Sequence, residues 1–284
     1  MSFKKLLAYS LGVIAIVSVV SYCSRTDVEA KTIERTVNNV VMYDYTDDLA
    51  ECISSFAFIP MIDTKGVKGI CKGNPFKNYA ILYDVTHKTP IMSMQRLFGT
   101  FGKVKRKNDF HEEPTLLDGD RPSLSDYKAV SYMYDKGHLT PAGDIPLSEN
   151  INESNQAMRD TFTLANMTPQ VSEFNRGVWG KVVEESTRKY VERVPNHKVF
   201  VYTGISGTQG YLANGTSIPA YMWKVIFDQT DNRAWAYWMP NSKDVSIETY
   251  PIIKVSELEL LIKNNGLVVD FRLPRNVGFI KNPK

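Results

Sequence analysis

The sequence contains the stretch Tyr134-Asp-Lys-Gly-His-Leu139, which follows a run of aromatic and β-branched residues. Tyr127, Val130 and Tyr132 precede it, and side chains of these kinds favour extended strands. We therefore expect a strand that extends from about Tyr127 to His138 and ends there. Taken alone, Asp-Lys-Gly-His is a weak functional signal, because Asp and Gly are common in turns and a single histidine is usually structural.

Two blocks further along the chain strengthen the signal. They are Asn166-Met-Thr-Pro-Gln170 and Asn175-Arg-Gly-Val-Trp179. After Asn175, apolar residues recur with helical spacing and polar residues occupy the positions between them. The apolar set is Val178, Trp179, Val182, Val183, Tyr190 and Val191, and the polar set is Lys181, Glu184, Glu185, Arg188 and Glu192. Asn175 would then open a helix that packs across the strands.

The residue types in these blocks suit the hydrolysis of a phosphodiester. That reaction needs a base to activate water and a cation to neutralise the charge of the transition state. His138 can be the base, since the unperturbed pKa of imidazole lies close to neutral pH. Asn175 can hold the cation through its amide oxygen, a hard ligand of the kind that magnesium accepts. The pattern indicates a metal-dependent nuclease.

The motifs resemble those of the DNA/RNA non-specific endonuclease family, the ββα-metal nucleases that include mitochondrial endonuclease G. Residues 134–139 are similar to the family's Asp-Arg-Gly-His signature, and residues 161–179 resemble the block with its metal-binding asparagine. Weaker similarity runs from about Cys52 to Pro274 in the family's order. It includes Tyr79-Ala-Ile-Leu-Tyr83, Lys88-Thr-Pro90, Val201-Tyr-Thr-Gly204, Tyr221-Met-Trp-Lys224, Met239-Pro-Asn241 and Val255-Ser-Glu-Leu-Glu259.

The resemblance implies a role for each matching residue. His138 would be the general base, and Asn175 would bind Mg²⁺ directly, with Mn²⁺ as a substitute. Asn166 would support metal-bound water or the phosphate. Asp135 would orient the imidazole or accept hydrogen bonds from waters on the metal. Lys136 stands where the family usually has arginine, so it would meet the substrate with a compact charge instead of a planar fork.

A second departure from the family follows Trp179. The family places a glutamate four residues after the tryptophan and an arginine four residues further on, but Val183 occupies the first of these places here. Glu184 and Arg188 keep the spacing one position later, and they share a helical face if a local shift absorbs the extra residue. Glu184 would then help to fix waters on the metal, and Arg188 would contact the scissile phosphate. The alternative is an ordinary helical ion pair.

Beyond the motifs, the chain alternates strands and turns. Residues 199–203, 221–227 and 234–239 are rich in β-branched or aromatic residues, with glycines between the segments. Residues 255–263 have helical spacing, and residues 145–154, rich in Ser and Asn, are interpreted as a loop. We expect an α+β fold with a central antiparallel sheet, flanking helices and a ββα-metal motif at the active site.

The 284-residue chain divides into a short N-terminal part and one catalytic domain. Two lysines precede an uncharged apolar stretch, residues 6–22, which is either a secretory signal or a short membrane anchor. We assign residues 1–30 to this signal or anchor, 31–50 to an N-terminal extension and 51–284 to a single nuclease domain. The domain would be exported to the periplasm or the extracellular space, or held by the anchor outside the cytoplasm.

The cysteines give a further expectation. Of the three, Cys23 follows the bulky Tyr22, which argues against a lipidation site, and Cys52 and Cys71 lie beyond the leader. Because an exported protein can pair its cysteines, we predict a disulfide between Cys52 and Cys71. Two buried free thiols are the alternative.

The charge of the chain does not decide its partner. The net charge is only +3, so nucleic-acid binding would depend on a local basic surface. The densest basic run consists of Lys103, Lys105, Arg106 and Lys107. Both a solvated loop and a phosphate-contacting loop are consistent with it.

Together these patterns predict an exported, magnesium-dependent endonuclease that cleaves DNA and RNA with little sequence preference. The alternative is a non-catalytic surface protein that captures nucleic acid in the same groove after losing turnover. The departures at Lys136 and Val183 favour that alternative. Intact Asp135, His138, Asn166 and Asn175 favour the enzyme, because binding alone would not require a base and a metal ligand together.

Overall fold

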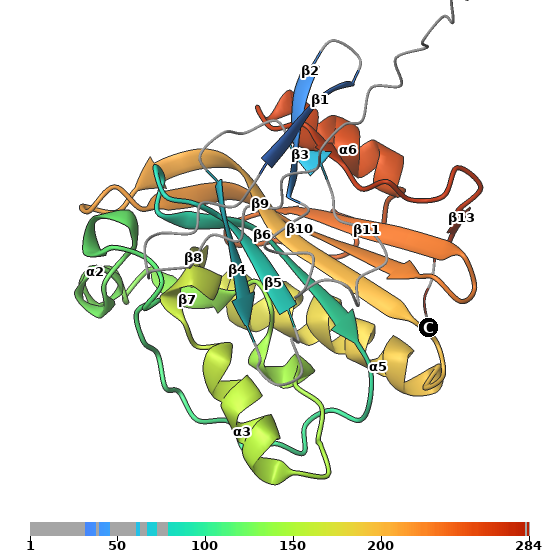
Figure 1. Ribbon diagram of the computed structural model, residues 1–284, viewed down its shortest axis with the longest axis horizontal. Helices are drawn as coiled ribbons and strands as arrows, with labels where there is room; N and C mark the ends of the chain where they lie inside the picture. Colours follow the sequence, from blue (N-terminus) through green and yellow to red (C-terminus); the bar gives the residue numbers. More distant parts are fainter. Residues whose placement is uncertain are drawn as a thin grey trace, which may run out of the picture.

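The computed structural model describes residues 32–37, 40–45, 61–62, 67–72, 79–281 and 283 (Figure 1). Its elements form the α+β arrangement that the sequence predicted. Within this part of the chain, no helix is both long and apolar enough to cross a bilayer. The predicted signal or anchor lies outside the described residues, as does Cys52, so its bridge to Cys71 stays a prediction.

A seven-stranded sheet forms the centre of the molecule (Figure 1). Its strands are, in order across the sheet, β13 (Gly278–Phe279), β11 (Arg233–Pro240), β10 (Ser217–Asp228), β9 (Val199–Tyr211), β6 (Thr89–Leu97), β5 (Tyr79–Asp84) and β4 (Val67–Lys72). Neighbouring strands are antiparallel, except for β11 and β13. The predicted central antiparallel sheet is confirmed, and β9, β10 and β11 contain the three predicted strand segments.

Both faces of this sheet are buried, which explains why its long strands are apolar without strict alternation. Along β10, Trp223, Val225 and Phe227 belong to one buried cluster, whereas Met222 and Ile226 belong to another. Successive side chains of a strand point to opposite faces. The two clusters therefore lie on opposite faces of the sheet, and each needs a covering layer.

Helices provide the two layers and lie on opposite sides of the sheet in Figure 1. The predicted helix near the end of the chain is confirmed as α6 (Val255–Asn264), which contributes Leu258 and Ile262 to the first cluster. Trp179 and Val183 join the second cluster from a helical segment that covers the other face. This segment consists of α4 (Ser172–Phe174), η4 (Asn175–Glu184) and α5 (Glu185–Arg193).

The helical segment differs from the prediction in two respects. It begins at Ser172 and not at Asn175, and η4 is a π-helix. Gly177 interrupts it with φ of −94° and ψ of −117°, which are not helical angles. A π-helix accommodates an extra residue in the helical turn, and a periodicity argument based on the α-helix does not detect it.

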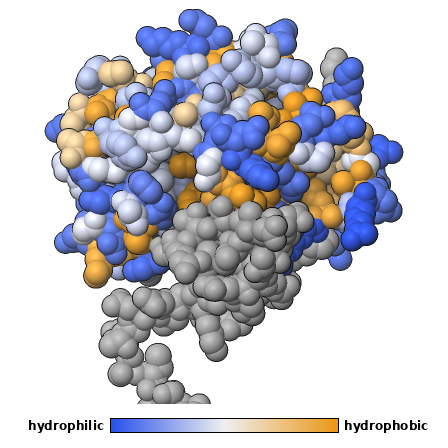
Figure 2. Space-filling model, turned by 90° about the horizontal axis from the view of Figure 1, so that it is seen from above, coloured by the Kyte–Doolittle hydropathy of each residue, from blue (hydrophilic) through white to orange (hydrophobic). Residues whose placement is uncertain are grey.

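A smaller, four-stranded sheet has the order β1 (Thr32–Val37), β2 (Val40–Tyr45), β3 (Met61–Ile62) and β12 (Val269–Asp270). β1 and β2 are antiparallel and lie in the range that the sequence assigned to an N-terminal extension. Through β3 they are joined to β12, near the other end of the chain. Where it is described, the surface in Figure 2 mixes hydrophilic and hydrophobic residues.

A separate two-stranded pair carries the Asp-Lys-Gly-His motif. β7 (Tyr134–His138) is antiparallel to β8 (Met167–Val171) and ends at His138, as predicted. The expectation that the strand extends back to Tyr127 is wrong, because Tyr127 lies in α2 (Leu124–Ala129). Ser123 and Asp126 form a capping box at the start of α2, and this local signal outweighs the strand preference of the aromatic residues.

The segment predicted as a loop, residues 145–154, ends in a helix. α3 (Ile151–Asp160) begins after Asn150, whose side-chain oxygen accepts a hydrogen bond of 3.1 Å from the backbone N–H of Asn152. Asparagine is common both in loops and at the start of helices, so composition alone favoured the loop. Three short 3₁₀ turns complete the described elements: η1 (Asp118–Asp120), η2 (Ala142–Asp144) and η3 (Leu164–Asn166).

Gly137 allows β7 and β8 to pair closely. A Cβ atom at Gly137 would lie 1.9 Å from Oε1 of Gln170, a side chain that is completely buried. We expect Gly137→Ala to displace Gln170 and to lower the free energy of unfolding by about 2 kcal/mol, as overpacking of a buried site does. Thermal unfolding measures the loss. Gly119→Ala is the matched control, because a Cβ atom there meets no heavy atom within 4 Å; equal melting temperatures for the two variants would contradict the prediction.

Candidate active site

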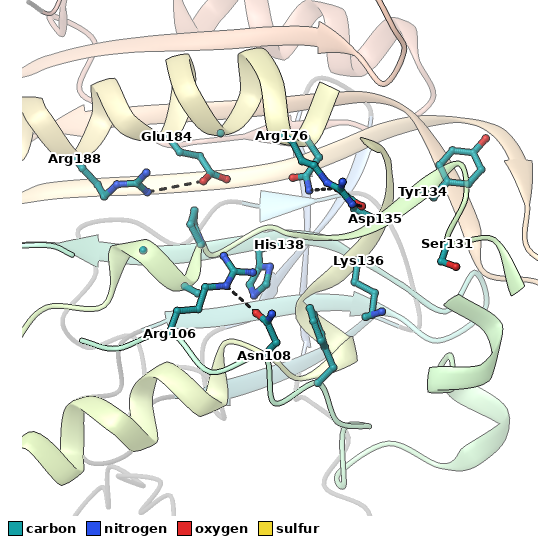
Figure 3. A pocket seen from close by; sticks show the side chains of 16 residues that line it. Arg106, Asn108, Ser131, Tyr134, Asp135, Lys136, His138, Arg176, Glu184 and Arg188 are labelled. Carbon is teal, nitrogen blue, oxygen red and sulfur yellow. Dashed lines mark hydrogen bonds and ion pairs between the residues drawn. The ribbon is translucent and has the colours of Figure 1, made fainter. Parts of the chain in front are cut away.

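A cavity of about 590 Å³ opens beside β7 (Figure 3). Its walls come from β7, from the helical segment η4–α5, from the turn at η2 and from the loop 106–110. Six residues singled out from the sequence line it: Asp135, Lys136, His138, Asn175, Glu184 and Arg188. Figure 3 shows His138 between the helix with Glu184 and Arg188 and the loop with Arg106 and Asn108.

The imidazole of His138 is almost completely buried, with 8% of the residue's surface exposed. It contacts Phe162 edge to face, with 4.9 Å between ring centroids, and lies 6.0 Å from the ring of Phe110. Burial, together with the positive charge of Arg106, lowers the pKa of His138 to about 3. Nε2 is shut off from solvent without a hydrogen-bond partner among the described residues, so Nδ1 is the ring nitrogen left to accept a proton.

Asn166 does not line the cavity, because its amide is used by the backbone beside His138. Its oxygen accepts a hydrogen bond of 3.0 Å from the Thr140 backbone N–H. Its nitrogen donates to the backbone oxygens of Thr140 and Thr161, at 2.9 Å each. The predicted contact of Asn166 with water or phosphate stays a prediction. The observed bonds show what this side chain does in the fold: it holds the chain that follows β7.

The carboxylate of Asp135 ties β7 to the start of the helical segment. It accepts hydrogen bonds from Asn175 Nδ2 at 2.9 Å, from Ser172 Oγ at 3.1 Å and from Arg176, whose Nε lies at 2.8 Å. Burial opposes the charged form, but these bonds outweigh it and hold the pKa of Asp135 below its ordinary value. With Nδ2 of Asn175 anchored in this way, its amide oxygen is free to serve as a ligand.

Glu184 and Arg188 are neighbours on the helix and are both largely buried. Arg188 lies 3.8 Å from the Glu184 carboxylate and 2.7 Å from that of Asp144. Burial raises the pKa of Glu184 to about 7, against the opposing effects of nearby Lys224 and Arg188. The carboxyl of Glu184 therefore changes charge near neutral pH.

A buried polar network supports this pair from inside the protein. Lys224 is 1% exposed, and its ammonium donates a hydrogen bond of 2.6 Å to Thr203 Oγ1. Burial lowers the pKa of Lys224, while Asp144 and Glu184 act in the opposite direction. Gln95 Nε2 donates to the second oxygen of Asp144 at 2.6 Å. The charges of two acidic side chains, Asp144 and Glu184, and two basic ones, Arg188 and Lys224, thus compensate one another at this wall of the cavity.

The opposite wall combines cations with aromatic rings. The ammonium of Lys136 lies 4.6 Å from the centre of the Phe110 ring, and the guanidinium of Arg106 lies 5.3 Å from that of Phe162. Arg106 also donates to Asn108 Oδ1 at 2.9 Å, as Figure 3 shows. These contacts place positive charges on both sides of His138.

The family model for DNA/RNA non-specific endonucleases matches residues 63–275 of the chain. The chain belongs to this family. The described fold is also similar to a solved chain of an EndoG/EndoGI inhibitory complex, with a TM-score of 0.57 and 24% identity, over 72% of this chain and 88% of that one. At this level of identity, the likeness shows the fold alone.

Among individual relatives, the mitochondrial nuclease EXOG of Danio rerio is 31% identical over 169 residues, which are 55% of this chain and 47% of that protein. A nuclease of Syncephalastrum racemosum is 30% identical over 62% of this chain and 58% of its own length. A nuclease of Serratia marcescens is 27% identical over 71% of both chains. The chain spans about half the length of the first of these relatives.

Membership of the endonuclease family makes the position of Glu184 informative. Glu184, which the sequence placed one residue beyond the position expected from the resemblance, lines the cavity together with Asn175 and Arg188. The π-helix η4 spans Asn175 to Glu184, directly before α5, and a turn of this kind holds one residue more than an α-helical turn. This segment is where the local shift would occur, and the correspondence of Glu184 and Arg188 to the family's pair stays a prediction.

A second group of possible metal ligands lies away from this cavity. His197, Asp228 and Asp231 offer atoms within 4.8 Å of one another. Asp228 Oδ2 already accepts a hydrogen bond of 2.7 Å from Tyr190 and lies 2.6 Å from His197 Nδ1. The backbone N–H of Asp231 donates a hydrogen bond of 3.1 Å to Asp228 Oδ1. These bonds explain the cluster as a support for the turn after β10.

Sequence reasoning missed four residues of the site and its support: Arg106, Arg176, Asp144 and Lys224. In the sequence, Arg106 is marked only as part of a basic run, and Lys224 only as part of the block Tyr221-Met-Trp-Lys224. Arg176 follows Asn175 directly, and its position beside a predicted ligand was the available signal. Nothing in the local sequence marks Asp144, which reaches the site through the fold.

The pKa values of His138 and His197 are expected to be shifted in opposite directions from the ordinary value of histidine. Burial lowers the pKa of His138 to about 3, whereas the hydrogen bond with Asp228 raises the pKa of His197 above its ordinary value. An NMR titration should show His197 taking up its proton above pH 6.5 and His138 remaining neutral there. The imidazole of His138 binds a proton more readily in the unfolded chain than in the folded protein. Its contribution to the free energy of unfolding is therefore lost progressively as pH falls below about 6.5. A His138 midpoint near 6.5 would contradict this account.

Proposed function

We propose that the chain is a magnesium-dependent endonuclease that hydrolyses phosphodiester bonds of DNA and RNA with little sequence preference. One observation carries the proposal: a neutral imidazole, an anchored amide and an acid–base pair meet at a single cavity. They belong to His138, Asn175 and the pair of Glu184 with Arg188. Family membership supports the same reading.

The donor atoms suit a small divalent cation. The hydrogen bond from Asn175 Nδ2 to Asp135 leaves the amide oxygen of Asn175 for the ion, and Glu184 adds a carboxylate to the same cavity. Oxygen donors of this kind are preferred by Mg²⁺, and Mn²⁺ accepts them as well. A bound ion would supply positive charge to the phosphate oxygens and to the leaving oxygen. Asn175 would hold it directly, and Asp135 would fix the orientation of Asn175.

The side chains of the protein carry the proton transfer and the binding of the phosphate. Nδ1 of His138 would accept the proton of the attacking water, since burial leaves the ring neutral at physiological pH. Burial also weakens the base, and a negatively charged phosphate bound beside the ring would raise its pKa again. Arg106 and Arg188 place guanidinium groups at the cavity, where they neutralise charge on the phosphate. Contacts of this kind reach the backbone of a nucleic acid and not its bases, so they imply little sequence preference.

Replacing the base and the ligand tests the mechanism. We expect His138→Ala to lower the rate of plasmid cleavage by about 10²- to 10⁴-fold, the usual contribution of a general base. Asn175→Ala should raise the Mg²⁺ concentration for half-maximal rate by more than about tenfold. Removing a residue that only orients a metal ligand can already lower metal affinity by this factor, and Asn175 would be the ligand itself. Cleavage of supercoiled plasmid and of RNA, with magnesium or with a chelator, measures both effects.

His87→Ala and Asn276→Ala are the matched controls, because neither residue lines the cavity. Normal cleavage by His138→Ala at neutral pH would refute the proposed base. If the wild type retards the plasmid without cutting it, whether or not magnesium is present, the chain is a capture protein and not an enzyme.

The proposal includes export of the nuclease domain. It rests on the uncharged apolar stretch at residues 6–22, which follows two lysines. Outside the cytoplasm, the enzyme would meet nucleic acid away from the cell's own genome. N-terminal sequencing of protein recovered from cell fractions distinguishes a cleaved leader from a retained membrane anchor.

A further inference from the structure

The basic loop 104–110 is fixed at both ends and presents its side chains in two directions. Val104 is buried in a cluster that includes Met158 of α3, and Phe110 packs beside the same cluster. Between these anchors, Arg106 and Asn108 line the catalytic cavity. The alternate residues, Lys105 and Lys107, line a second groove of about 270 Å³.

Helix α3 forms the other wall of this second groove. The buried Met158 contributes to its floor, and four polar residues of α3 line it: Asn152, Asn155, Gln156 and Arg159. Their spacing places them on one face of the helix, opposite the face that buries Ala157 and Met158. The exposed face therefore offers amide groups and a guanidinium.

The groove carries an excess of positive charge. Arg159 Nε lies 2.9 Å from the carboxylate of Asp109, so these two charges compensate each other. Lys105 and Lys107 are exposed, and neither ammonium has an ion pair or hydrogen bond with any other described residue. Two uncompensated cations thus face the side-chain amides of Asn152 and Asn155 across the groove.

We infer that this groove, hereafter the α3 groove, binds the phosphate backbone of the nucleic acid next to the segment held in the catalytic cavity. The inference rests on the proposed nuclease function and extends the substrate site across the basic loop. Lys105 and Lys107 would bind phosphates, and Asn152 and Asn155 would donate hydrogen bonds to phosphate or sugar oxygens. Gln156 Nε2 already donates to Asp160 at 2.7 Å, so this side chain only lines the groove.

The arrangement of the loop favours a polynucleotide over a small anion. Consecutive Cα atoms are only about 3.8 Å apart, so one strand of nucleic acid that crosses the loop can reach both grooves. Cations and amides are the groups that proteins use to position a nucleic-acid backbone without reading its sequence. A short phosphodiester would occupy the catalytic cavity alone and would gain nothing from the second groove.

The test compares Lys105→Gln/Lys107→Gln with a control of equal charge, Lys103→Gln/Lys263→Gln, whose residues line neither groove. Two substrates are used with the full chain: a nitrophenyl phosphodiester and a single-stranded oligonucleotide long enough to span both grooves. Oligonucleotide binding is also measured by fluorescence anisotropy in chelator over a range of salt concentrations. This binding measurement does not depend on catalysis.

We expect the α3-groove variant to raise KM for the oligonucleotide by about tenfold, with kcat and the rate on the small phosphodiester unchanged. The slope of log affinity against log salt should become shallower by about 1.4, or 0.7 for each of two lost phosphate contacts on a single strand. The control should match the wild type. A variant whose KM and salt slope equal those of the control would overturn the inference, as would an equal loss on both substrates.

The two proposals fail in different ways. If the wild type hydrolyses neither substrate, the proposed function is wrong, but the salt slopes still decide whether the α3 groove binds phosphates. If the wild type hydrolyses both and the slopes do not differ, the enzyme stands without this second groove.

Discussion

The hydrogen bonds to the carboxylate of Asp135 hold the candidate site together. This one group accepts bonds from Ser172, Asn175 and Arg176, which belong to the helical segment, while Asp135 itself lies in β7. Strand and helix are thereby fixed to each other at the point where the base and the ligand must meet. Charge-assisted bonds are stronger than neutral ones, and Arg176 adds the charge. The link adds side-chain bonds to the pairing of β7 with β8, which runs directly into the helical segment at Ser172.

The helical wall of the cavity depends on compensated buried charges. Taking Lys224, Asp144, Glu184 and Arg188 out of water is unfavourable, and only mutual pairing and hydrogen bonds offset that cost. The compensation is incomplete at Glu184, whose pKa rises to about 7. A carboxyl with a raised pKa responds strongly to nearby positive charge, which is a useful property beside a cation and a phosphate.

Much of the fold could be read from local patterns, and the failures have identifiable physical causes. The apolar runs that became β9, β10 and β11 were recognisable because both faces of the central sheet are buried. The aromatic side chain of Tyr127 is typical of a strand, but the helix cap at Ser123 decides the local structure and places Tyr127 in α2. α3 was missed because Asn150, a helix cap, is also a typical loop residue.

The sequence by itself determined the family and the strand-and-helix motif and predicted the residues of the candidate site, since residue type and order along the chain encode these features. Only the tertiary structure placed Glu184 in the cavity, through the π-helix η4, and brought Asp144 and Lys224 behind it. It also separated the basic loop into residues that face His138 and residues that face α3. The reason is physical: contacts between segments far apart in sequence depend on the path of the backbone and on packing, and no local periodicity records them.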